Sequence, residues 1–204
     1  MSDTVTPAPK TLLALAGAPA TPSPLETAAL VLIDAQREYT DGALPLAGVE
    51  AAVAEAARLL GLARTTGVPV FHVVHHGKPG GALFNPEGPL SGIVAPLAPV
   101  DGETVVVKHL PNAFAGTDLD ALIRATGRKE LIIAGFQTHM CVSSTVRAAL
   151  DLGWRTTVVD AACATRDLPD GAGGIVPAEV QHRASLAALA DRFAVVVRSS
   201  RAWG

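Results

Sequence analysis

Short apolar runs of strand length alternate with helical stretches over most of this chain, and this alternation limits the fold more than any other feature. The strand-length runs cover residues 28–33, 68–74, 104–107, 131–134, 156–159 and 194–197. The helical stretches cover residues 49–66, 118–126, 136–152 and 178–192. Runs that are apolar without interruption are typical of strands buried on both faces.

Repeated strand–helix units predict a parallel sheet with right-handed crossovers and helices on both faces. We therefore expect an α/β protein, a single three-layer doubly wound domain whose parallel sheet has about six strands. Residues 27–204 form this domain in our interpretation. Residues 1–26, rich in Ala and Pro, form an N-terminal arm with one helical turn over 11–16.

The composition excludes several classes of protein. Hydrophobic residues make up 49% of the 204 residues, which is enough for one large core. The 16 Lys and Arg residues face 19 Asp and Glu residues, so we expect no nucleic-acid partner. No apolar stretch approaches the roughly 18 residues of a membrane span, and the first residues lack the pattern of a secretory signal. Two cysteines without metal-ligand spacing indicate reduced thiols and a cytoplasmic protein.

Three predicted strand ends carry reactive side chains. Asp34 follows the first strand, Lys108 follows the third, and Cys141 lies shortly after the fourth. The carboxyl ends of parallel strands open onto one crevice, so we expect these three residues to meet there. Each also has a structural interpretation: a helix-capping carboxylate, a solvated lysine and a small core residue. A non-catalytic binding or scaffold protein is therefore an alternative, and it predicts that Cys141→Ala loses no function.

An acid, a cation and a thiol together support covalent amide hydrolysis. We expect Thr138 to cap a helix and place Cys141 in its first turn, where the helix dipole favours a thiolate. Asp34 then acts as general acid and base, and Lys108 keeps it ionised. Backbone N–H groups of the 137–141 loop stabilise the oxyanion.

Three motifs resemble those of the isochorismatase-like cysteine hydrolases. They are Leu32-Ile33-Asp34-Ala35-Gln36, Lys108 with the 112–119 segment Asn-Ala-Phe-Ala-Gly-Thr-Asp-Leu, and Gly135-Phe136-Gln137-Thr138-His139-Met140-Cys141-Val142. The resemblance covers about residues 26–198. It implies a catalytic triad of Asp34, Lys108 and Cys141, a cis peptide bond at Phe136–Gln137, and oxyanion donors from the N–H groups of Gln137 and Cys141. It also implies a homodimer or homotetramer.

The chain differs from the sequence patterns of two sub-groups of this family, and these differences reduce the number of activities that we expect. Isochorismatase-type vinyl-ether hydrolases lack the nucleophilic cysteine that Cys141 supplies here. Metal-containing nicotinamidases carry histidines after the first strand, and segment 39–46 has none. His75 and His76 are adjacent on a strand and face opposite sides, so we expect no metal and no cofactor. Both activities stay as alternatives to C–N hydrolysis of a small amide, ureido compound or lactam. The Thr-His-Met-Cys segment also resembles streptothricin-hydrolase-like members.

Side chains near the three strand ends are candidates for the walls of a substrate pocket. The expected substrate-binding residues are Gln36, Tyr39, Phe84, Leu110, Phe114, Thr138 and His139. Aromatic residues are only 4% of the chain, and several of those near the site fall on predicted loops. That placement favours a lined pocket over incidental packing. We interpret Cys163 as structural and place it on the loop after the fifth strand.

Overall fold

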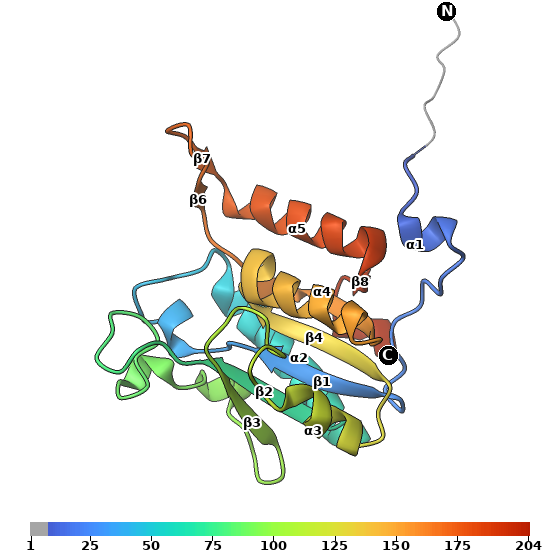
Figure 1. The fold of residues 1–204 in the computed structure, drawn as a ribbon, viewed down its shortest axis with the longest axis horizontal. Helices are drawn as coiled ribbons and strands as arrows, with labels where there is room; N and C mark the ends of the chain where they lie inside the picture. The colour runs from blue at the N-terminus through green and yellow to red at the C-terminus, as the bar shows by residue number, and fades with distance from the viewer. Residues whose placement is uncertain (1–7) are drawn as a thin grey trace, which may run out of the picture.

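A computed structural model describes residues 8–204 and confirms the doubly wound α/β fold (Figure 1). The main sheet has six strands in the order β3-β2-β1-β4-β5-β8, and all neighbours are parallel. Its strands are β1 (Ala28–Ile33), β2 (Val70–His75), β3 (Thr104–Lys108), β4 (Glu130–Phe136), β5 (Arg155–Ala164) and β8 (Val195–Val197). The order reverses beside β1, so the crevice between the ends of β1 and β4 is where such folds place their sites.

Helices cover both faces of the sheet, as the strand–helix alternation predicts. The helices are α1 (Leu12–Leu15), α2 (Val49–Thr66), α3 (Leu119–Ala125), α4 (Ser143–Asp151) and α5 (Ala178–Arg192). One apolar cluster joins α2 to Leu30 and Leu32 of β1, and a second joins α3, α4 and α5 to Val31 and Ile33. Because successive strand residues face opposite sides, β1 contributes to both cores and is fully buried.

The helices over 49–66 and 178–192 are predicted with the bounds that the structure shows. Two details differ. Strand β5 continues to Ala164, so Cys163 lies within the strand and pairs with Gly135 instead of lying on the following loop. The segment after β5 also forms a small antiparallel hairpin of β6 (Leu168–Pro169) and β7 (Ile175–Val176), which projects beyond α5 in Figure 1.

The N-terminal segment is attached to the body of the domain. Helix α1 forms near the expected residues, and its Leu12 N–H donates to Asp191 at the end of α5 over 2.8 Å. Ser23 is buried, and its N–H donates to the hydroxyl of Thr157 over 2.7 Å. Residues 1–7 of the predicted arm lie outside the described part of the chain.

Gly135 allows β4 to approach the end of β1. Its φ is +123°, and a Cβ at this position would lie 2.0 Å from the carbonyl oxygen of Ile33. Every other amino acid would therefore collide with the strand that carries Asp34. The close approach places the segment after Phe136 beside Asp34.

Between residues 8 and 204, no helix combines the length and the apolar character that a membrane span requires.

Candidate active site

Asp34, Lys108 and Cys141 meet at the carboxyl ends of the strands, where the sequence analysis places them. Asp34 directly follows β1 and Lys108 ends β3, while Cys141 lies on a π-helical turn, η4 (Thr138–Val142). Lys108 Nζ is 2.8 Å from Asp34 Oδ2 and 3.4 Å from Cys141 Sγ. Asp34 and Lys108 are 0% exposed and Cys141 is 5% exposed, so the cluster is shielded from bulk water.

The side chain of Asp34 reaches the cluster because its backbone adopts an uncommon conformation. Its φ of +49° lies in the left-handed region, which a residue with a Cβ rarely adopts. Its N–H donates to the carbonyl oxygen of Val73 on β2 over 2.8 Å. A strained non-glycine residue at the end of a central strand is typical of a functional position.

Burial dominates the electrostatics of the cluster. It raises the pKa of Asp34 to about 6, against the lowering influence of the Lys108 charge and of hydrogen bonds from Lys108 and the Cys141 thiol. Burial, together with the Asp34 charge, raises the pKa of Cys141 to about 12, although Lys108 acts in the opposite direction. The expectation of a thiolate favoured by a helix dipole is therefore wrong for the resting site. These directions favour a protonated sulfur at neutral pH, and a pKa of about 6 leaves Asp34 ionised there.

The turn that carries Cys141 differs from the predicted helix start. Thr138 does not cap a helix, because the residue at the cap position is Gln137 and its side chain makes no capping bond. The hydroxyl of Thr138 instead pairs with Nδ1 of His182 at 2.9 Å. The Gln137 carbonyl accepts N–H groups from Met140 at 3.0 Å and Val142 at 3.2 Å, which closes the turn. The peptide bond between Phe136 and Gln137 is cis, as the resemblance implies.

Two aromatic side chains from the predicted pocket cover this region. The ring of Tyr39 packs edge-on against Phe84 at 5.2 Å and against Phe136 at 5.9 Å between centroids. Tyr39 and Phe84 are both buried. Burial, then the charges of Asp34 and Cys141, raise the pKa of Tyr39, so its hydroxyl stays protonated near the cluster.

The other predicted pocket residues are placed differently. Leu110 is 54% exposed on the loop after β3, and Phe114 is half-buried and packs against the core on the α3 and α4 side. The buried Thr138 turns its hydroxyl to His182, and half-buried His139 directs Nδ1 to the hydroxyl of Thr165 at 2.5 Å. Among residues 8–204, no hydrogen bond or ion pair joins these four side chains to Asp34, Lys108 or Cys141.

Gln36 is fully buried, and its side-chain amide forms hydrogen bonds with backbone groups. Its Nε2 donates to the carbonyl oxygens of His75 at 2.9 Å and Ser91 at 2.7 Å. Its Oε1 accepts the N–H of His75 at 2.8 Å. These contacts tie the end of β1 to the end of β2, and both donor hydrogens of the amide are engaged.

Three polar residues near the cluster are not among the predicted site residues. Nδ1 of His75 lies 3.4 Å from Lys108 Nζ. Glu38 is 2% exposed, and its carboxylate accepts the N–H groups of Ala43 at 2.9 Å and Phe84 at 3.1 Å. Nε of Arg166, just beyond β5, is buried and has no hydrogen-bond partner among residues 8–204. Their positions at or near strand ends are the only sequence signal that could have indicated them.

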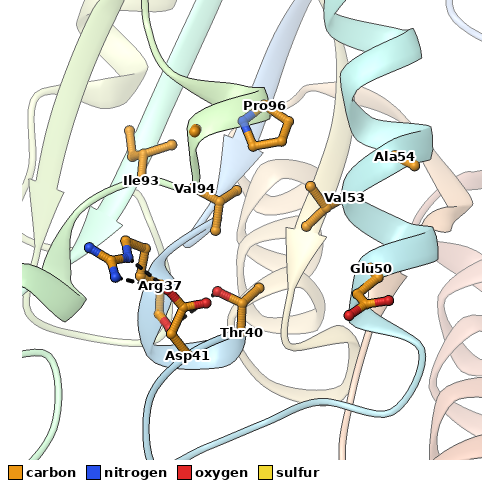
Figure 2. A pocket seen from close by; sticks show the side chains of 10 residues that line it. Arg37, Thr40, Asp41, Glu50, Val53, Ala54, Ile93, Val94 and Pro96 are labelled. Atoms are coloured by element: carbon orange, nitrogen blue, oxygen red, sulfur yellow. Dashed lines mark hydrogen bonds and ion pairs between the residues drawn. The ribbon is translucent and has the colours of Figure 1, made fainter.

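A separate hollow of about 740 Å³ lies on the α2 side of this region (Figure 2). Arg37, Thr40 and Asp41 form one wall, and Val53 of α2 faces Val94 across it. Asp34, Lys108 and Cys141 do not line it. Within the described part of the chain, no three His, Cys, Asp or Glu side chains are grouped in a way that would hold a metal ion.

Comparison with known proteins decides the family. The model of the isochorismatase domain matches residues 28–201, which is most of the chain. The chain belongs to the isochorismatase family. It is an isochorismatase-family hydrolase.

Several relatives and solved structures are similar to this chain over most of its length. A secreted isochorismatase effector of Verticillium dahliae is 36% identical over 183 residues, which cover 90% of this chain and 94% of the relative. A streptothricin hydrolase of Streptomyces noursei is 38% identical over 181 residues, covering 84% of this chain and 63% of that protein. A crystal structure of an isochorismatase from Pseudomonas putida KT2440 has a TM-score of 0.90 and 43% identity, and covers 95% of this chain and 99% of its own.

Proposed function

We propose that this isochorismatase-family member hydrolyses a C–N bond of a small amide, ureido compound or lactam through a thioester on Cys141. The observation that carries the proposal is the buried cluster in which Lys108 Nζ lies 2.8 Å from Asp34 and 3.4 Å from Cys141. A thiol with a raised pKa needs a base close by, and Asp34 with a pKa near 6 is ionised at neutral pH.

In the acylation step, the Asp34 carboxylate takes the proton from the Cys141 thiol as sulfur attacks the amide carbonyl carbon. The C=O electron pair moves to oxygen, and backbone N–H groups of Gln137 and Cys141 are the proposed donors to this oxyanion. When the tetrahedral intermediate collapses, the C–N bond breaks and protonated Asp34 returns the proton to the leaving nitrogen. The products are an acyl thioester on Cys141 and an amine or ammonia, and the amine of an opened lactam stays attached to the acyl group.

In the deacylation step, Asp34 takes a proton from water as the water oxygen attacks the thioester carbonyl. Collapse breaks the C–S bond, and Asp34 returns its proton to sulfur, so the thiol and a carboxylic acid are released. Lys108 keeps one charge throughout both steps. Its ammonium stabilises the ionised carboxylate in a site where burial alone would favour protonation.

Relatives that act on amides support this chemistry over vinyl-ether hydrolysis. A maleamate amidohydrolase of Pseudomonas putida is 36% identical over 147 residues. An ureidoacrylate amidohydrolase of Variovorax paradoxus is 26% identical over 193 residues. A solved N-carbamoylsarcosine amidase of Thermoplasma acidophilum has a TM-score of 0.72 at 26% identity. Cys141, beside both Asp34 and Lys108, gives this chain the nucleophile that C–N cleavage needs.

Arg166 favours substrates with a negative charge. Its buried Nε lacks a hydrogen-bond partner within residues 8–204, and a guanidinium recognises carboxylates well. The charge of Arg166 opposes the burial-driven rise in the pKa of Tyr39 and adds to the burial-driven fall in the pKa of His139, so it acts within electrostatic reach of both side chains. We infer that amides with a carboxylate, such as maleamate and ureidoacrylate, are better substrates than streptothricin.

A substrate panel tests the proposal. Maleamate, ureidoacrylate, N-carbamoylsarcosine and streptothricin are incubated with the protein, and hydrolysed product is measured by mass spectrometry. We expect product from at least one compound, a loss of at least about 100-fold in Cys141→Ala, and retained activity in the matched control Cys163→Ala. Equal activity in Cys141→Ala and the unaltered protein would instead support a non-covalent mechanism, and no product from any of the four compounds would support the scaffold alternative.

The assembly and location of the protein stay predictions. We propose a homodimer or homotetramer, and light scattering of the purified chain measures its mass directly. A cytoplasmic location is favoured by two free, buried cysteines, Cys141 and Cys163. One relative is a secreted effector, so cell fractionation is the test for this chain.

A further inference from the structure

The ammonium of Lys108 needs three hydrogen-bond acceptors. A lysine ammonium carries three donors, and Lys108 is 0% exposed, so its site excludes bulk water. Asp34 Oδ2 lies 2.8 Å from Nζ and Cys141 Sγ lies 3.4 Å from it. The third polar atom beside Nζ is Nδ1 of His75, also at 3.4 Å. The structure thus gives Nζ of this buried cation an ion pair with Asp34 and hydrogen-bond contacts with Cys141 and His75.

His75 is itself held in place from two sides. It ends β2 and pairs with Lys108 in the strand register. Gln36 fixes its backbone by accepting its N–H at 2.8 Å and donating to its carbonyl oxygen at 2.9 Å. The ring packs edge-on against Phe84, with centroids 5.2 Å apart and planes at 84°. The imidazole therefore presents Nδ1 to Lys108 from a fixed position.

We propose that His75 is a positioning residue for this hydrolase, a neutral imidazole whose Nδ1 accepts the third ammonium proton of Lys108. The proposal rests on the function proposed above for Asp34, Lys108 and Cys141. His75 completes the set of acceptors that holds Nζ against the carboxylate and the sulfur. It acts through Lys108 and touches neither the substrate nor the breaking bond.

The charge state of His75 fits this role. Burial, followed by the charges of Lys108, His109 and His76, lowers the pKa of His75 to about 4. The ring is therefore neutral at the pH values at which Asp34 is ionised, and only a neutral ring has a nitrogen lone pair for Lys108. With Nδ1 as acceptor, the one ring proton resides on Nε2.

Loss of the His75 acceptor should change the pKa of Asp34. An unmatched N–H in a buried site is costly, so the ammonium moves toward other acceptors and loosens its contact with the carboxylate. The charge and hydrogen bond of Lys108 both lower the pKa of Asp34, so a looser contact raises that pKa above about 6. The groups facing Lys108 are Asp34, Cys141 and His75, and those around His75 are Lys108, His76 and His109.

Kinetics of two His75 variants test the proposal on the best substrate of the panel. We expect His75→Leu to lower kcat about 10- to 100-fold with KM changed less than about threefold, and to move the acid limb of kcat/KM to higher pH. His75→Asn places an amide oxygen near the position of Nδ1 and should restore most of kcat and the normal limb. His76→Leu, one residue along, is the control and should leave both unchanged.

Nitrogen NMR of histidine-labelled protein gives a readout without substrate. We expect His75 to be the Nε2–H tautomer between pH 6 and 8, with an Nδ1 resonance that shifts in Lys108→Met. A proton on Nδ1, a His75→Leu profile equal to that of His76→Leu, or a raised KM with normal kcat would each overturn the proposal. Retained activity in Cys141→Ala would overturn the proposed function instead, and the NMR test of His75 would still stand.

Discussion

Replacing Lys108 tests how much its ion pair with Asp34 contributes to the stability of the protein. Both side chains are 0% exposed, and Nζ lies 2.8 Å from Oδ2. The substitution Lys108→Met keeps nearly the same volume, so it removes the charge without opening a large cavity. It leaves the Asp34 carboxylate buried beside no cation, and breaking one side of a buried pair costs about 3–5 kcal/mol.

We therefore expect Lys108→Met to lower the free energy of unfolding by about 3–5 kcal/mol at pH 7.5, measured by urea denaturation. The double variant Asp34→Asn with Lys108→Met removes both charges and should recover most of that loss. Lys129→Met is the control, because Lys129 is exposed, and it should stay within about 0.5 kcal/mol of the unaltered protein.

The stability loss caused by Lys108→Met should depend on pH in a direction that the pKa of Asp34 determines. Asp34 has a folded-state pKa raised from 3.8 to about 6, so the folded state holds its proton more tightly than the unfolded chain does. This contribution to stability is present at low pH and is lost as pH rises toward the folded-state pKa. Without Lys108 that pKa is higher still, so the deficit of Lys108→Met should shrink between pH 7.5 and pH 5. A loss below about 1 kcal/mol, or a deficit that grows toward pH 5, would refute the reasoning.

Four further predictions follow from the site. The thiol of Cys141, with its pKa raised to about 12, should react with iodoacetamide at pH 7 more slowly than a free cysteine, measured in a Cys163→Ser background; a rate as fast as that of a free cysteine contradicts it. Loss of ionised Asp34 should lower kcat/KM about tenfold per pH unit below pH 6, and a flat profile down to pH 4 argues against Asp34 as the base. Arg166→Met should raise KM for acidic amides at least about tenfold without affecting streptothricin, as initial rates will show. Gly135→Ala should destabilise the fold by more than about 3 kcal/mol in thermal unfolding, because its Cβ would lie 2.0 Å from Ile33 O.

The fold and the reactive cluster could be predicted because both follow from periodicity and strand order. The uninterrupted run over 28–33 and the helical pattern over 49–66 each depend only on local residues, and both are observed with those bounds. Parallel topology then brings Asp34, Lys108 and Cys141 to one edge. No knowledge of side-chain packing is needed for that step.

The surroundings of the cluster could not be predicted in the same way. Thr138 has the residue type of a helix cap, and only the packing of α5 shows that its hydroxyl pairs with His182 instead. Gln36 lies two residues after Asp34, but its amide donates to the carbonyl oxygens of His75 and Ser91, which are distant in the sequence. The pKa of Cys141 is raised by burial and by the charge of Asp34, and both depend on how distant parts of the chain pack around the thiol.

A covalent acyl group on Cys141 is the central claim, and an activated ester measures it most directly. The p-nitrophenyl ester of the best panel acid does not need protonation of its leaving group, so it should acylate the unaltered protein faster than water releases the thioester. We expect a stoichiometric burst of p-nitrophenol and an acyl mass increment on the peptide that contains Cys141, but none on the peptide that contains Cys163. The absence of a burst, or an ester hydrolysed equally fast by Cys141→Ala, would contradict the account.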